Sequence, residues 1–148
     1  MSATYSFYKV VSDLIDYCNS NAVIKSVTYD QTFKLEGNRV DNLPAVIIER
    51  DTSSFSSGEN VFSLRVIIVD LPKENDSDRL AIHSKTHLIL DQMEAHFSLG
   101  QTAQYSIIND ISPEPVSYAY DDRVEGWAAT FDFSVRRDTD GCEYPVNE

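Results

Sequence analysis

Hydrophobic side chains alternate with small or polar ones along residues 124–135, and this pattern constrains the possible folds strongly. The apolar set occupies every second position: Trp127, Ala129, Phe131, Phe133 and Val135. Side chains of a β-strand point alternately to opposite faces of a sheet, whereas a helix would distribute these aromatic rings around its axis. The segment therefore predicts a strand of an antiparallel sheet that is covered on one side only. Trp127, Phe131 and Phe133 are its expected structural core residues.

Two other segments have the periodicity of amphipathic helices, at residues 4–19 and 79–98. The apolar positions of the first are Phe7, Val10, Val11, Leu14, Ile15 and Cys18, and those of the second are Ile82, Thr86, Ile89, Leu90, Met93 and Phe97. Each set follows the spacing of a single helical face. Both helices are expected to pack on the apolar face of the sheet.

Further strands are predicted from runs of β-branched and aromatic residues. These runs are residues 23–29, 45–50, 61–71, 104–109 and 116–120. A polar loop is expected at 30–43, with one short strand near 32–35, and a turn-rich hairpin connection at 51–60. Pro113 and Pro115 are expected to interrupt the pattern between the last two runs. The resulting fold class is α+β, a mainly antiparallel β-sheet with two amphipathic helices packed on one face. Residues 1–148 form a single domain, with about 136–148 as a polar C-terminal tail or arm.

The chain is strongly acidic, with 24 Asp and Glu against 12 Lys and Arg and a formal net charge of -12. This excess disfavours binding to the phosphate backbone of a nucleic acid, because few cationic side chains are present to displace its counterions. The charge serves either solubility or a surface past which DNA slides without sticking. No apolar run approaches the roughly 20 residues that span a bilayer, and no signal-peptide pattern begins the sequence. We expect no membrane partner and reduced Cys18 and Cys142.

No sequence motif indicates an enzyme or a cofactor. The five glycines do not cluster as a phosphate-binding loop requires, and Gly-x-Ser-x-Gly, Cys-x-x-Cys and His-Glu-x-x-His are absent. We therefore expect no catalytic, cofactor-binding or metal-binding residues. Cys142 as a nucleophile has no histidine near it in sequence. The acidic pairs Asp121-Asp122 and Glu114 with Glu125 are better explained by turn chemistry than by catalysis.

One constellation on the second predicted helix has two interpretations. His83 and His87 are four residues apart, and Asp91 and Glu94 continue near the same face. Such residues could hold a transition metal, because imidazole nitrogens and carboxylate oxygens one turn apart can converge. The same positions lie opposite the apolar stripe, where a solvated polar face belongs. The solvated face is the simpler interpretation.

The order of these elements resembles that of small neck and tail-completion proteins of tailed bacteriophages, including crAss-like phages. The most specific part of the resemblance is Asp122-Arg123-Val124-Glu125-Gly126-Trp127, together with Cys142 to Pro145 near the end of the chain. The rest is a match of pattern and order over nearly the full length. The resemblance implies a structural virion protein, a tail terminator or head–tail connector, without catalytic residues.

Such a subunit would be made in the host cytoplasm and form a homo-oligomeric ring of sixfold or twelvefold symmetry in the virion. Its implied partners are neighbouring neck, portal or tail proteins, with DNA passing only transiently through the lumen. The candidate assembly contacts are Phe55, Lys34, Arg39, Arg136, Arg137 and Tyr144. Phe55 has a second interpretation, in which its ring folds back onto the sheet. The alternative functions are a small cytosolic α+β binding or regulatory domain and a metal-dependent enzyme that uses His83 and His87.

Overall fold

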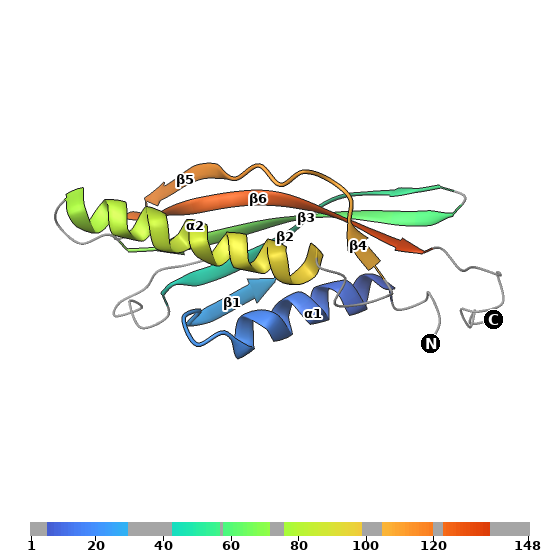
Figure 1. Ribbon diagram of the computed structural model, residues 1–148, viewed down its shortest axis with the longest axis horizontal. Helices are drawn as coiled ribbons and strands as arrows, with labels where there is room; N and C mark the ends of the chain where they lie inside the picture. Colours follow the sequence, from blue (N-terminus) through green and yellow to red (C-terminus); the bar gives the residue numbers. More distant parts are fainter. Residues whose placement is uncertain are drawn as a thin grey trace.

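The computed structural model of the protein describes residues 6–29, 43–56, 58–71, 76–98, 105–119 and 123–136. These ranges contain two helices, α1 (Ser6–Ser20) and α2 (Asp76–Ser98), and six strands. The strands are β1 (Ser26–Tyr29), β2 (Ala45–Phe55), β3 (Glu59–Asp70), β4 (Tyr105–Ile107), β5 (Glu114–Ala119) and β6 (Arg123–Arg136). Figure 1 shows the long strands β2, β3 and β6 running side by side, with both helices lying along them.

The six strands form one mixed sheet with the order β1-β2-β3-β6-β4. β1 pairs with β2 in parallel, and every other pair is antiparallel. β3 pairs with β6 over nearly its whole length, so β4 and β5 both lie along the opposite edge of β6. β4 pairs with residues 133–135 and β5 with residues 123–128. The architecture is α+β with a mostly antiparallel sheet, which confirms the predicted fold class.

Both helices bury their apolar stripes against the same face of the sheet. The main core combines Val10, Leu14, Leu90, Met93 and Phe97 of the helices with Val46, Ile48, Leu64, Val66, Ile68, Ala129, Phe131, Phe133 and Val135 of the strands. The sheet residues occupy alternate positions, as the strand period requires. The predicted core role of Phe131 and Phe133 is confirmed, since both are fully buried. Trp127 packs against the same core and is only partly buried.

The opposite face of the sheet carries a second, smaller apolar cluster. It consists of Leu43, Ala45, Ile47, Ile67, Val69, Val124 and Ala128, with Leu71 and Val116 packed against it. No residue of either helix belongs to this cluster in the described ranges. The prediction that β6 is covered on one side only is therefore wrong for its first half. The centre of β3 is buried on both faces, since Val66, Ile67, Ile68 and Val69 are all buried.

β2 and β3 form a hairpin that is much longer than the sequence predicts. β2 continues to Phe55 and β3 begins at Glu59, so most of the expected turn-rich connection is strand. The β2–β3 register shifts between Arg50 and Ser53, where a β-bulge interrupts the ladder. Beyond Glu49 the side chains of β2 are exposed. In Figure 1 this hairpin extends past the ends of both helices.

The connection between β4 and β5 stays attached to β6 through one asparagine side chain. Asn109 Nδ2 donates to the Thr130 carbonyl oxygen at 2.9 Å, and the Asp132 N–H donates to Asn109 Oδ1 at 2.9 Å. The Ile108 N–H donates to the Asp132 carbonyl oxygen at 3.0 Å. The side-chain amide therefore replaces a backbone peptide group between the two short strands. β4 and β5 act together as one interrupted edge strand.

Pro115 corrects another expectation, because it lies inside β5 opposite Trp127 instead of interrupting the strands. Proline is tolerated on an edge strand, where its missing N–H need not serve the ladder. The predicted strand at 104–109 is shorter, at Tyr105–Ile107. The predicted strand near 32–35 lies outside the described residues. No described helix is long and apolar enough to cross a membrane.

Candidate functional site

The segment at the start of β6 holds helix α2 to the sheet through a buried carboxylate. Glu125 is only 4% exposed and lies on β6 between Asp70 of β3 and Ser117 of β5. Arg79 Nη2 lies 2.9 Å from its Oε2 atom, and His83 Nε2 lies 2.7 Å from its Oε1 atom. Because a carboxylate only accepts hydrogen bonds, His83 donates its Nε2 proton here. Both donors come from the first turns of α2, so one glutamate fixes this end of the helix.

The charge state of Glu125 follows from this arrangement. Burial alone would raise its pKa, because the charged form loses hydration. The hydrogen bonds from His83 and Arg79 and the positive charge of Arg79 outweigh that cost, so the pKa lies below the usual value. Glu125 is therefore a carboxylate at neutral pH. A buried carboxylate that is held by an ion pair with Arg79 and a hydrogen bond from His83 supports a structural role for Glu125.

Trp127 and Gly126 complete the attachment of α2. Trp127 Nε1 donates to the His83 carbonyl oxygen at 2.9 Å, and the His87 ring lies edge-on to the indole with centroids 5.2 Å apart. At Gly126 a Cβ atom would overlap the carbonyl oxygen of Ile68 on β3. Glycine is thus required by the close approach of the two strands. Glu125 and Trp127, which belong to the segment on which the phage resemblance depends most, dock a helix onto the sheet.

His83 and His87 of α2 do not form a shared ligand set with Asp91 and Glu94. His83 is hydrogen-bonded to Glu125, and His87 packs against Trp127. Among the described residues no three His, Cys, Asp or Glu side chains are placed to hold a metal ion. The interpretation of this face as solvated is wrong for His83, which bridges α2 to β6. The interpretation of Glu125 as a turn residue is also wrong, whereas Glu114 is exposed on β5.

We expect the interactions of Glu125 to make the free energy of unfolding depend on pH in the acidic range. A lowered folded-state pKa contributes stability that is present at neutral pH and is lost as pH falls below about 4.5 and through the folded-state value. Glu125→Gln should cost about 2 kcal/mol at neutral pH, and the deficit should shrink in acid. Urea unfolding of both proteins across this pH range measures the effect. Glu114→Gln, which alters an exposed carboxylate, should leave the pH dependence of the free energy of unfolding as in the wild type. A deficit for Glu125→Gln that stays constant with pH would contradict the assignment.

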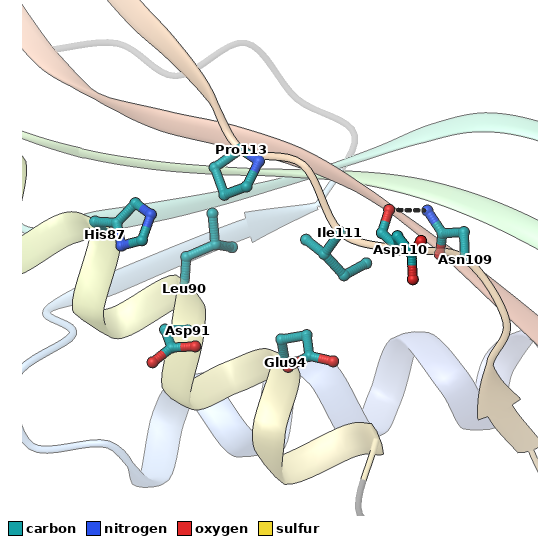
Figure 2. A pocket seen from close by; sticks show the side chains of 8 residues that line it. All are labelled: His87, Leu90, Asp91, Glu94, Asn109, Asp110, Ile111 and Pro113. Atoms are coloured by element: carbon teal, nitrogen blue, oxygen red, sulfur yellow. Dashed lines mark hydrogen bonds between the residues drawn. The ribbon is translucent and has the colours of Figure 1, made fainter.

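An open groove lies between α2 and the connection from β4 to β5. Its volume is about 350 Å³, and it is lined by His87, Leu90, Asp91, Glu94, Asn109, Asp110, Ile111 and Pro113. Figure 2 shows Asp91 and Glu94 on the helix side, with Asn109 and Asp110 on the facing segment. Three of the eight lining residues carry carboxylates, and Asn109 already uses its amide on β6. The groove therefore favours a cationic side chain over an anion.

The hairpin end of the sheet is the second surface with the chemistry of a contact site. Phe55 is 70% exposed at its tip, next to Ser53, Ser54 and Ser56. Cross-strand hydrogen bonds stiffen the ribbon behind it: Ser63 Oγ donates to Asp132 Oδ1 at 2.6 Å, and Ser134 Oγ donates to Glu59 Oε1. Phe55 therefore does not fold back into the core. Of its two interpretations, the exposed one agrees with the structure.

The other candidate assembly contacts are only partly covered by the structure. Arg136 is the last residue of β6 and pairs with Glu59 at the hairpin, so its backbone lies at the same end as Phe55. Lys34, Arg39, Arg137 and Tyr144 lie outside the described residues, as do Asp121, Asp122 and Cys142. Cys18 is buried in the main core, and burial raises the pKa of its thiol to about 12. A buried thiol with this pKa is unreactive.

Sequence reasoning missed the roles of Glu125 and Asn109. A charged residue inside an otherwise apolar strand pattern was the available signal for Glu125, because a buried carboxylate needs a partner. The pairing with Arg79 and His83 joins positions 46 and 42 residues apart, which local periodicity does not reveal. Asn109 carried no comparable signal, since asparagine is common in loops for other reasons.

Comparisons with known proteins identify the fold and leave the family open. No protein-family model matches the sequence, and no curated protein matches it. Among solved structures, one chain superposes with a TM-score of 0.61 over 95% of this chain and 99% of its own, at 11% sequence identity. Similarity at that identity shows a shared fold alone. The fold thus occurs over the full length of another chain of about this size.

Proposed function

We propose that this protein is a structural subunit of a tailed-phage virion that forms a ring at the neck. The ring joins the portal to the tail or terminates the tail tube, and DNA passes through its lumen. The observation that carries the proposal is the long β2–β3 hairpin, which reaches past both helices with Phe55 exposed. Phe55 at the tip of this stiff ribbon belongs to neither apolar cluster of its own subunit. It is suited to contact a neighbour.

The charge and the sequence resemblance support the same proposal. A net charge of -12 suits a lumen that must not retain passing DNA, because a negative surface repels phosphates. The Asp-Arg-Val-Glu-Gly-Trp segment resembles neck and tail-completion proteins, and its Glu125 and Trp127 dock α2 onto the sheet of the subunit. The hairpin, at the opposite end, is stiffened by its own cross-strand hydrogen bonds. A rigid contact element favours assembly, because less conformational entropy is lost on contact.

We expect the purified full-length chain to form closed rings as its concentration rises. Phe55→Ser should weaken this assembly without changing the thermal stability of the subunit, since the Phe55 side chain is not part of the core. Leu80→Ser is the matched control, because Leu80 is also 70% exposed and lies in the first turns of α2. That end of α2 is remote from the hairpin (Figure 1). Native mass spectrometry and negative-stain electron microscopy measure the outcome.

A chain that remains monomeric at every accessible concentration would contradict the ring. It would instead favour a small cytosolic α+β domain that acts through a binding partner. Equal loss of assembly in Phe55→Ser and Leu80→Ser would show that the hairpin tip is not the contact. Closed particles with a central channel, weakened only by Phe55→Ser, would support the proposal.

A further inference from the structure

The hairpin end of the molecule is a four-stranded sheet with both of its edges in the described part of the chain. The strand registers align Phe55 with Asn60, Asn60 with Val135, and Val135 with Tyr105. The next level joins Ser54, Val61, Ser134 and Ser106 in the same way. β2 is therefore one outer strand at this end and β4 is the other. The two edges lie on opposite sides of the same ribbon.

Strand directions make these two edges complementary to each other. β2, β3, β6 and β4 alternate in direction, because each neighbouring pair is antiparallel. β4 consequently runs opposite to β2. A second copy related by rotation about an axis roughly along the strands keeps the same strand directions. Its β2 would then lie antiparallel to β4 of the first copy, and the alternation would continue unbroken.

The side chains on these edges permit such pairing. β1 adjoins only Ala45–Ile48, and no described strand lies on the outer side of residues 51–54 of β2. This stretch is Asp-Thr-Ser-Ser and is exposed, as is Ser106 on β4. Proteins usually protect an edge strand with charged side chains, proline or a β-bulge. The bulge and Asp51 lie at the start of this stretch, but Ser53, Ser54 and β4 carry no lysine, proline or bulge, whereas the other half of the outer edge of β6 is covered by β5 with its Pro115.

We propose that residues 51–54 of β2 in one copy pair with β4 of the next copy, head to tail, so that the sheet continues from subunit to subunit. The inference rests on the proposed ring and names its contact. Backbone hydrogen bonds then supply much of the affinity, and the exposed Phe55 lies at the seam. Because the two surfaces differ, the contact is heterologous, the kind of contact that builds a ring when the rotation between neighbours closes.

Two proline variants test the edge of β2 and control for each other. Neighbouring N–H groups of a strand point to opposite sides, so one of Ser53 and Ser54 points its N–H toward β3 and the other points it outward. Of Ser53→Pro and Ser54→Pro, one should lower the melting temperature and the other should leave it unchanged. The variant with unchanged stability should lose the ring-sized species in native mass spectrometry. Full assembly by that variant would overturn the pairing.

Cysteine cross-linking identifies the partner strand. In a Cys142→Ser background, Ser106→Cys is combined in turn with Thr52→Cys, Ser53→Cys and Ser54→Cys, because opposed residues of neighbouring strands lie within disulfide range. Oxidation should give a ladder of covalent multimers for at least one pair. Rings without cross-links in all three pairs would overturn the pairing while the proposed function stands. Dimers from a β2 cysteine alone would also overturn it, by showing a two-fold contact. A protein that stays monomeric under all conditions would contradict the proposed function as well.

Discussion

Gly126→Ala should destabilise the protein by about 3 kcal/mol or more, or prevent it from folding. The added Cβ would overlap the carbonyl oxygen of Ile68 and press on the Cα atom of Val69, both backbone atoms of β3. A flexible side chain could move aside, but these atoms belong to the central ladder between β3 and β6. The strands must therefore separate where Val69 pairs with Gly126. Thermal and urea unfolding measure the loss.

Gly58→Ala is the matched control for this substitution. Gly58 follows the hairpin tip, and a Cβ built there meets nothing within 4 Å. Its stability should change by less than about 0.5 kcal/mol. If both alanine variants proved equally stable, the close approach of β3 and β6 at Gly126 would be wrong.

Phe133→Ala should cost about 3 to 5 kcal/mol, because it removes the centre of an aromatic cluster. The Phe133 ring is fully buried, and its centroid lies 5.6 Å from that of Tyr105, 6.2 Å from Phe97 and 6.0 Å from Phe131. These partners come from β4, α2 and β6. No one of them can fill the cavity without leaving its own element.

Tyr8→Ala provides the comparison for the loss of an aromatic ring. Tyr8 is 71% exposed on α1, so its removal should change stability by less than about 0.5 kcal/mol. Urea unfolding at low protein concentration separates the two variants and keeps assembly from contributing. A cost below about 1 kcal/mol for Phe133→Ala would mean that β4 and α2 do not converge on this strand.

The elements that the sequence predicts best are those whose pattern is local and long. β6 alternates from Trp127 to Val135, and α2 repeats its apolar stripe from Ile82 to Phe97, over about four turns. Each pattern reports which side chains face the core, so the strand, the helix and Phe131 and Phe133 follow without knowledge of their neighbours. The predicted packing of both helices on one face follows from the same patterns, because each element offers a single apolar surface.

The candidate contact surfaces and the attachment of α2 depend on long-range contacts that the sequence pattern does not contain. Ser53 and Ser54 have weak strand preference, and they extend β2 because β3 and β6 continue beside them as a template. Glu125 is buried because α2 delivers Arg79 and His83 to it. Asn109 holds β4 and β5 to one edge because its amide meets two peptide groups of β6.

Local patterns and composition were enough to predict the α+β class, the strand at 124–135, the two amphipathic helices and the acidic character of the protein. The length of the hairpin, the parallel placement of β1, the second apolar cluster and the complementary edges at the hairpin end became visible in the folded chain alone. The difference lies in how far apart along the chain the interacting residues are. Side-chain periodicity and net charge are properties of neighbouring residues or of the sum of residues, whereas register, edge and burial depend on which distant segments pair.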